Sequence, residues 1–164
     1  MCGLWYNPFN ERTTAIPTAP REEGAVRLTR GADYGTRGIV RLARMAPTSV
    51  ALVRDIATAE GLPESYLAKI FQDLTRGGLV RSHRGAKGGF SLARPAEQIT
   101  LRQIIEAIEG PIALNRCLAP WEGCECAGNC SIYPVLLRAQ EELLAILDGT
   151  TLHDLTDGMA KLPG

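Results

Sequence analysis

Apolar residues recur at helical spacing through the first half of the chain and predict three successive helices. The first covers residues 33–45, and nearby glycines weaken it, because glycine costs up to about 1 kcal/mol relative to alanine inside a helix. The second, Val53–Glu60, is short and ends at Gly61, which suits the position after a helix. The third covers residues 63–76 and carries four expected core residues on one face: Leu67, Ile70, Phe71 and Leu74.

The spacing of the apolar residues changes in the next segment. Residues 79–82 and 90–93 are strand-like runs joined by a glycine-rich, cationic segment, which is typical of a wing after a helix-turn-helix. Thr100 and Gln103 have the spacing of a capping box, which predicts a helix that continues to Glu109. A long helix is expected over residues 132–147, followed by a short last helix capped by Thr151.

These elements predict a mainly α fold with a small β wing. We expect a winged helix-turn-helix DNA-binding domain (residues 26–110), a cysteine-rich loop (residues 111–131), and a long helix with a C-terminal segment (residues 132–156). Residues 1–25 have no periodicity and are expected to be a disordered tail. A more specific hypothesis is a mis-assigned start, with translation beginning at Val26, since valine can be encoded by the alternative bacterial start codon GTG. The intact mass of the native protein would test it.

Charge is distributed unevenly, although the whole chain has a net charge of zero. Residues 26–110 carry thirteen lysines and arginines against eight acidic residues, whereas residues 111–164 carry three against seven. The basic part is therefore the expected phosphate-binding surface.

Within this basic part, some polar residues are placed to contact double-stranded DNA. The third helix would offer its N-terminal residues to the major groove, and the tip of the wing would reach the minor groove. The candidate contacts are Ser65, Tyr66, Lys69, Arg84 and Lys87. The alternatives are a winged helix that contacts another protein, and individual residues of this set that contact no base. His83 is interpreted as a hydrogen-bonded hinge residue.

Composition excludes several classes of protein. No run approaches the roughly 18 uncharged apolar residues of a membrane-spanning helix, and the N-terminus lacks the pattern of a signal peptide. Five cysteines, an odd number, fit a secreted disulfide framework poorly. We therefore expect a cytoplasmic protein with no membrane partner. An enzyme is not expected, because no Ser/His/Asp, paired-carboxylate or phosphate-loop constellation is present.

Four cysteines lie within fourteen residues: Cys117, Cys124, Cys126 and Cys130. Soft thiolates on one glycine-containing loop are typical ligands of an iron–sulfur cluster. A structural zinc site is one alternative, although it usually has Cys-x-x-Cys pairs that this loop lacks. A metal-free thiol switch, in which two cysteines oxidise to a disulfide, is the other.

Three segments resemble the Rrf-two family of bacterial transcriptional regulators, which includes iron–sulfur cluster regulators and nitric-oxide sensors. They are residues 26–34 (VRLTRGADY), 62–71 (LPESYLAKIF) and 78–90 (GLVRSHRGAKGGF). The resemblance covers residues 26 to about 156. It implies a homodimer that pairs through the long helix and binds an operator, with Arg84 of the wing in contact with DNA.

The resemblance also implies an iron–sulfur cluster, with 2Fe-2S favoured and 4Fe-4S as the alternative. Cys117, Cys124 and Cys130 have a spacing similar to the family's three-cysteine motif and are the implied ligands. Cys126 is extra: it could replace Cys124, act as a fourth ligand, or be a spectator.

The remaining ligand differs between branches of the family. IscR-like members have a histidine three positions after the last cysteine, where this chain has Tyr133. NsrR-like members use an aspartate of the first helix, supplied by the other subunit, and Asp33 stands at that position. The alternative is that Asp33 is an ordinary first-turn carboxylate, stabilised by the helix dipole.

Overall fold

Thr29 starts the first helix of the structure, α1 (Arg30–Ala43). Its side-chain oxygen accepts hydrogen bonds from the backbone N–H groups of Gly31 (3.1 Å) and Ala32 (3.4 Å), which have no partner inside the helix. The apolar pattern placed the start of this helix at Asp33, but the helix begins three residues earlier.

This computed structural model describes residues 28–46, 49–85, 88–119, 121–122, 124 and 127–156. The expected tail or alternative start at residues 1–25 lies outside them.

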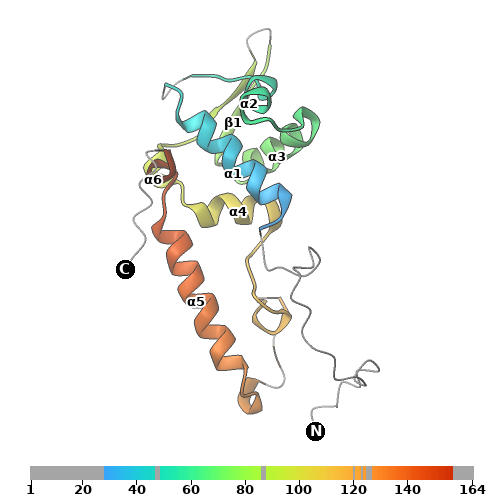
Figure 1. Cartoon of the computed structure of the whole chain (residues 1–164), viewed down its shortest axis with the longest axis vertical. Helices are drawn as coiled ribbons and strands as arrows, with labels where there is room; N and C mark the ends of the chain where they lie inside the picture. Colours follow the sequence, from blue (N-terminus) through green and yellow to red (C-terminus); the bar gives the residue numbers. More distant parts are fainter. Residues whose placement is uncertain are drawn as a thin grey trace, which may run out of the picture.

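Helices α1, α2 (Val53–Glu60) and α3 (Glu64–Arg76) pack around a shared apolar core (Figure 1). Helix α2 has the predicted bounds and ends at Gly61, whose φ of 65° is the left-handed conformation that glycine adopts easily. The four residues predicted to face the core from α3 are all buried: Leu67, Ile70, Phe71 and Leu74. This packing fixes the orientation of α3 and leaves its other face free.

Two glycines of α1 mark where neighbouring helices approach most closely. A Cβ at Gly35 would lie 2.3 Å from Cδ1 of Ile108 and 2.9 Å from Cγ2 of Ile70. A Cβ at Gly38 would lie 2.9 Å from the ring of Phe71. All three distances are shorter than van der Waals contact, so only glycine lets side chains of α3 and α4 pack directly on the backbone of α1. Helix propensity alone makes these glycines unfavourable, and packing explains their positions.

Strands β1 (Val80–His83) and β2 (Gly89–Leu92) form the predicted wing, an antiparallel hairpin with Val80 opposite Leu92. Strand β2 also pairs with the segment before α2, where Ala51 and Phe90 exchange backbone hydrogen bonds of 2.9 and 2.8 Å. The Phe90 ring packs edge-to-face on Phe71, with ring centroids 5.1 Å apart. The wing is therefore attached to the helix-turn-helix body by backbone pairing and by the core.

Helix α4 (Leu101–Glu109) follows a short 3-10 turn, η1 (Ala96–Gln98), and packs against α1 and α3. It begins with the predicted capping box: the Thr100 hydroxyl accepts from the Gln103 N–H (3.3 Å), and the Gln103 side chain accepts from the Thr100 N–H (3.2 Å). At the C-terminal end, α6 (Leu152–Thr156) contacts α1 and buries Leu152 completely. Thr151 caps α6 as predicted, by accepting from the Asp154 N–H (3.2 Å).

Helix α5 (Tyr133–Gly149) extends away from the winged-helix body (Figure 1). None of its side chains is buried. The leucines that predict this helix are only partly buried, and Val135 is 66% exposed. Among the described residues, no helix is both long and apolar enough to cross a membrane. The architecture confirms the mainly α fold with a small β wing.

Candidate functional site

The recognition helix α3 presents Ser65, Tyr66 and Lys69 on its exposed side. Burial of the opposite face in the core fixes which residues remain outside, so these three are available to a DNA groove as the sequence predicts. Ser65 lies in the first turn and contacts no other element through a hydrogen bond that the structure records.

Tyr66 also contacts helix α1, which the sequence did not indicate. Its ring packs edge-to-face on Tyr34 of α1, with centroids 5.9 Å apart and planes at 81°. Together with Lys69, it lines a cavity of about 400 Å³ between α3, the start of α1 and the end of α4. Tyr66 is 41% exposed, so it faces solvent and the start of α1 at the same time.

The wing places Arg84 at its exposed end, directly after β1. Nε2 of His83 lies 2.8 Å from Oγ of Ser91 on the opposite strand, which agrees with the interpretation of His83 as a hinge residue. Gly85 has a φ of 105°, a backbone conformation that turns the hairpin and that side chains rarely permit. Lys87, the other predicted wing contact, lies outside the described residues.

The cysteine-rich loop contains two 3-10 turns, η2 (Arg116–Leu118) and η3 (Ala127–Asn129), and η2 contacts α5. Cys117, Cys124 and Cys130 are free thiols, each half-buried. An ion pair between Arg116 and Glu122 (2.9 Å) holds the loop between the first two cysteines. Cys126 lies outside the described residues.

Cys117 interacts with the other two thiols. Burial raises the pKa of Cys117, and the charges of Cys124 and, more weakly, Cys130 raise it further, together with a hydrogen bond to the Cys124 side chain. The loop therefore brings three soft sulfur donors into one neighbourhood. Within the described ranges, however, no three His, Cys, Asp or Glu side chains are arranged closely enough to hold a metal ion.

Asp33, the fourth predicted ligand, lies in the first turn of α1. Its carboxylate is 4.0 Å from the guanidinium of Arg37, one turn along the helix, and its side chain is 55% exposed. The interaction of the three thiols involves no group on α1. The carboxylate therefore remains accessible to another molecule.

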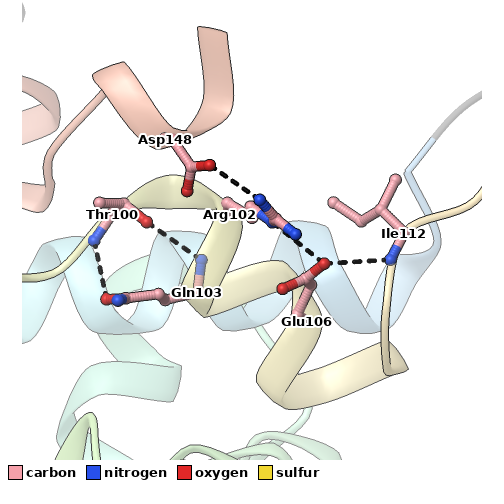
Figure 2. A network of polar contacts seen from close by, with 6 residues as sticks. All are labelled: Thr100, Arg102, Gln103, Glu106, Ile112 and Asp148. Carbon is pink, nitrogen blue, oxygen red and sulfur yellow. Dashed lines mark hydrogen bonds and ion pairs between the residues drawn. The ribbon is translucent and has the colours of Figure 1, made fainter. Parts of the chain in front are cut away.

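A polar network joins the start of the cysteine-rich loop to α4 and α5 (Figure 2). The guanidinium of Arg102 lies 2.8 Å from the Asp148 carboxylate at the end of α5 and 3.1 Å from the Glu106 carboxylate. Glu106 in turn accepts a hydrogen bond from the Ile112 N–H (3.2 Å). The hydrogen bonds that Arg102 donates to Asp148 and then to Glu106 raise its pKa above the usual value. Sequence analysis missed this network, and the four-residue spacing of Arg102 and Glu106 on one helix was the available signal.

Comparisons with known proteins agree with this fold. The sequence model of the family Rrf2, described as an iron-dependent transcriptional regulator, matches residues 28–158. Rv1287 of Mycobacterium tuberculosis, named as an HTH-type transcriptional regulator, is 33% identical over 137 residues, which are 81% of this chain and 83% of that protein. Protein aau3 of Rhizobium meliloti is 34% identical over 138 residues, 84% of this chain and 89% of that protein.

Two solved structures are similar over most of their length. CymR of B. subtilis, titled the global cysteine regulator, is 30% identical with a TM-score of 0.66, over 81% of this chain and 98% of that one. IscR of T. potens is 25% identical with a TM-score of 0.66, over 85% of this chain and 94% of that one.

A winged helix-turn-helix with an exposed recognition helix, together with these relatives, defines a DNA-binding transcriptional regulator and not an enzyme. The chain belongs to the Rrf-two family, as its sequence motifs indicated.

Proposed function

We propose that this regulator binds its operator as a homodimer, and that an iron–sulfur cluster on the cysteine-rich loop controls the affinity. The observation that supports the proposal is that Cys117, Cys124 and Cys130 are free, half-buried thiols on one loop, with the other two near enough to Cys117 to raise its pKa. Three half-buried thiols on one loop, tied to α5 through η2, can respond together to a single reactive group.

The donor set fits a cluster of the 2Fe-2S or 4Fe-4S type, because iron–sulfur clusters are held mainly by cysteine thiolates. Cys117, Cys124 and Cys130 would be the ligands from one chain, and Asp33 of the second copy would complete the set. The cluster would supply a group that reacts with oxidants or nitric oxide, or that is lost when iron is scarce. The exposed Asp33 carboxylate, paired with Arg37 only at 4.0 Å, supports this assignment.

The homodimer is supported by the exposed side of α5. Apolar residues of α5 and its N-cap recur at intervals of three, four and seven and form a stripe that the described part of the chain leaves exposed: Ile132, Val135, Ala139 and Ile146. A helix that is apolar on two sides requires a second partner, and a second copy of α5 presents the same stripe by symmetry. Pairing through α5 would set two copies of α3 and of the wing on one operator.

For contact with DNA, we assign Ser65, Tyr66 and Lys69 to the major groove and Arg84 and Lys87 to the minor groove or the phosphates. The exposure of Ser65, Lys69 and Arg84 supports this assignment. Cationic side chains on α3 and on the wing would supply affinity, while a small number of base contacts would supply specificity.

A metal-free thiol switch is the second candidate. It is favoured by the similarity to CymR, titled the global cysteine regulator, one of whose solved structures, from Staphylococcus aureus, is of an oxidised form. The hydrogen bond between Cys117 and Cys124 brings two thiols together that could oxidise to a disulfide. A zinc site is a third alternative, with the same thiols as ligands.

Anaerobic purification followed by visible spectroscopy and metal analysis separates these candidates. The cluster predicts a red-brown protein containing iron and sulfide, and loss of both in Cys117→Ser, Cys124→Ser and Cys130→Ser variants. A colourless protein with bound zinc would establish the zinc site instead. A colourless, metal-free protein whose DNA binding responds reversibly to oxidant and reductant would establish the thiol switch.

A further inference from the structure

The carboxylate of Glu109 connects the end of α4 to the beginning of α1. Glu109 is the last residue of α4, and its Oε1 accepts hydrogen bonds from the Thr29 hydroxyl and from the Ala32 N–H (3.2 Å). Both donors belong to the N-terminus of α1, where a negative charge is stabilised by the helix dipole. Glu109 therefore caps α1 from a different helix, together with the local cap Thr29.

The beginning of α1 is in turn packed against the recognition helix. A Cβ at Gly31 would lie 3.3 Å from the Tyr66 hydroxyl oxygen and 3.4 Å from Cγ2 of Ile108. The Tyr66 ring also packs on Tyr34, one turn further along α1. Through these contacts with Gly31 and Tyr34, a movement of the first turn of α1 would be transmitted to Tyr66, which lies in the first turn of α3.

On its other side, Glu109 is followed at once by the cysteine-rich loop. Gly110, with a φ of 84°, turns the chain, and Pro111 continues it. Residues 112 and 114 are held at two points: the Ile112 N–H donates to Glu106 (3.2 Å), and the Leu114 N–H donates to Gln140 of α5 (3.0 Å). A change in the path of residues 110–114 therefore acts directly on the backbone that carries Glu109.

The cavities on either side of Glu109 give it room to move. It lines the cavity of about 400 Å³ beside Tyr66 and Lys69, and also an open, mainly apolar cavity of about 520 Å³ that Leu143 and Leu147 of α5 line as well. The carboxylate thus lies between the recognition helix and the region where α4, α5 and the cysteine-rich loop meet. Loss of its two hydrogen bonds would leave the start of α1 with Thr29 as its only side-chain cap among the described contacts.

We infer that Glu109 is a positioning residue that couples the state of the cysteine-rich loop to the orientation of the recognition helix through Thr29, Gly31 and Tyr66. When the loop changes its path, Glu109 withdraws from the N-terminus of α1, the first turn of α1 shifts, and Tyr66 moves with it. The inference rests on the proposed function, in which chemistry at the cysteines controls DNA binding.

The test measures operator affinity in two states of the full-length protein. The probe is a fluorescent DNA duplex selected from a random library by the wild-type protein. One state is the anaerobically purified protein, and the other is the same protein treated with an oxidant and an iron chelator. The quantity of interest is the ratio of the two dissociation constants, measured for wild type, Glu109→Ala, Glu109→Gln and a control, Glu97→Ala. Glu97 lies on η1, its side chain is 63% exposed, and its removal changes the net charge equally.

We expect Glu109→Ala to bring the ratio toward one, a reduction of about two- to thirtyfold, while the visible spectrum of the purified protein is unchanged. Glu109→Gln should keep most of the ratio, because its amide oxygen can accept both hydrogen bonds. Glu97→Ala should keep all of it. If Glu109→Ala does not fold, Thr29→Val removes the hydroxyl donor instead and should also lower the ratio.

Two results would count against these ideas, and they are distinguishable. If wild type has a large ratio and Glu109→Ala (or Thr29→Val in its place) weakens both affinities equally, Glu109 has only a structural role and the inference is overturned. If the wild-type ratio is itself one, cysteine control of DNA binding is overturned, and the coupling role fails with it.

Discussion

The guanidinium of Arg102 lies 2.8 Å from the carboxylate of Asp148, which joins the first turn of α4 to the end of α5. The same guanidinium contacts Glu106, the residue that accepts a hydrogen bond from the backbone at Ile112. One side chain therefore holds together the DNA-binding body, the long helix and the first residues of the cysteine-rich loop.

Removal of this bridge should lower stability modestly. The side chains of Arg102 and Asp148 are 33% and 49% exposed, so we expect Arg102→Gln to cost about 0.5–1 kcal/mol. The loss should shrink at high ionic strength, because salt screens exposed charges. Urea unfolding at low and high salt measures both effects. Arg54→Gln is the control: its ion pair with the adjacent Asp55 is more exposed, at 67% and 64%, and should contribute close to nothing. Equal losses of unfolding free energy in Arg102→Gln and Arg54→Gln would contradict a stabilising role for the ion pair between Arg102 and Asp148.

Gly35→Ala should destabilise the protein although alanine is the better helix former. The gain in propensity is about 1 kcal/mol, but the added methyl group would lie 2.3 Å from Ile108 and would force repacking that costs about 1–3 kcal/mol. Chemical unfolding should therefore show a net loss. Gly149→Ala, at a helical position with open space around it, should show no loss. A Gly35→Ala variant more stable than wild type would show that α4 does not pack on α1 as described.

Arg84→Ala should weaken operator binding by about 1–3 kcal/mol if the wing contacts DNA. A base contact would relax the sequence preference, whereas a phosphate contact would lower the slope of affinity against salt by about one. Titrations over a range of salt concentrations on selected and scrambled duplexes distinguish the two. Arg138→Ala removes an exposed arginine of α5 instead, and its effect on operator affinity should be small. If both variants behaved alike, the wing assignment would be wrong.

The double variant Val135→Glu/Ile146→Glu should dissociate the proposed homodimer. Both side chains are exposed in the single chain, at 66% and 40%, and two charges at a buried apolar contact are strongly unfavourable. Sedimentation velocity should show monomers for the double variant and dimers for wild type. Glu141→Gln and Glu142→Gln, on the same helix, serve as charge controls. A double variant that remained dimeric would place the interface elsewhere.

Asp33→Ala and Cys126→Ser test the two candidate ligands other than Cys117, Cys124 and Cys130. If the proposed cluster is bound, we expect Asp33→Ala to change the visible spectrum and to make its iron easier to remove by a chelator, because one ligand would be lost. Cys126→Ser should leave the spectrum unchanged if this thiol is a spectator. Arg37→Ala is the control for Asp33, since it removes the ion-pair partner and keeps the carboxylate. An unchanged Asp33→Ala spectrum would leave Asp33 as an ordinary first-turn carboxylate, stabilised by the helix dipole.

Sequence patterns predicted a helix or its cap closely where the residues that determine it lie near one another in the chain. The bounds of α2, the capping box of Thr100 and Gln103, and the cap at Thr151 all depend on residues a few positions apart. The start of α1 was missed because the apolar pattern begins after its cap, Thr29. The glycines of α1 were treated as unfavourable because their benefit lies in contacts with Ile108 and Phe71, which are distant in sequence.

In the candidate site too, features set by nearby residues were predicted and contacts between distant residues were not. Exposure of Ser65, Lys69 and Arg84 followed from the helical pattern and the hairpin. The contact between Glu109 and the start of α1 joins residues 77 positions apart, and no periodicity encodes it. The family resemblance implied three cysteine ligands, whereas the effect of Cys124 and Cys130 on Cys117 depends on the path of the loop between them.

The exposed stripe of α5 has a consequence for the amount of regulator in the cell. No side chain of α5 is fully buried within its own chain, so the proposed pairing would add to its stability, and the stability of the folded state would rise with the concentration of the chain. Under the proposed pairing, scarcity of the protein would favour single chains that lack both the second reading helix and the second Asp33. The number of copies of the protein in the cell would then itself control transcription, because dissociation of the dimer would both remove operator binding and open the cysteine-rich loop.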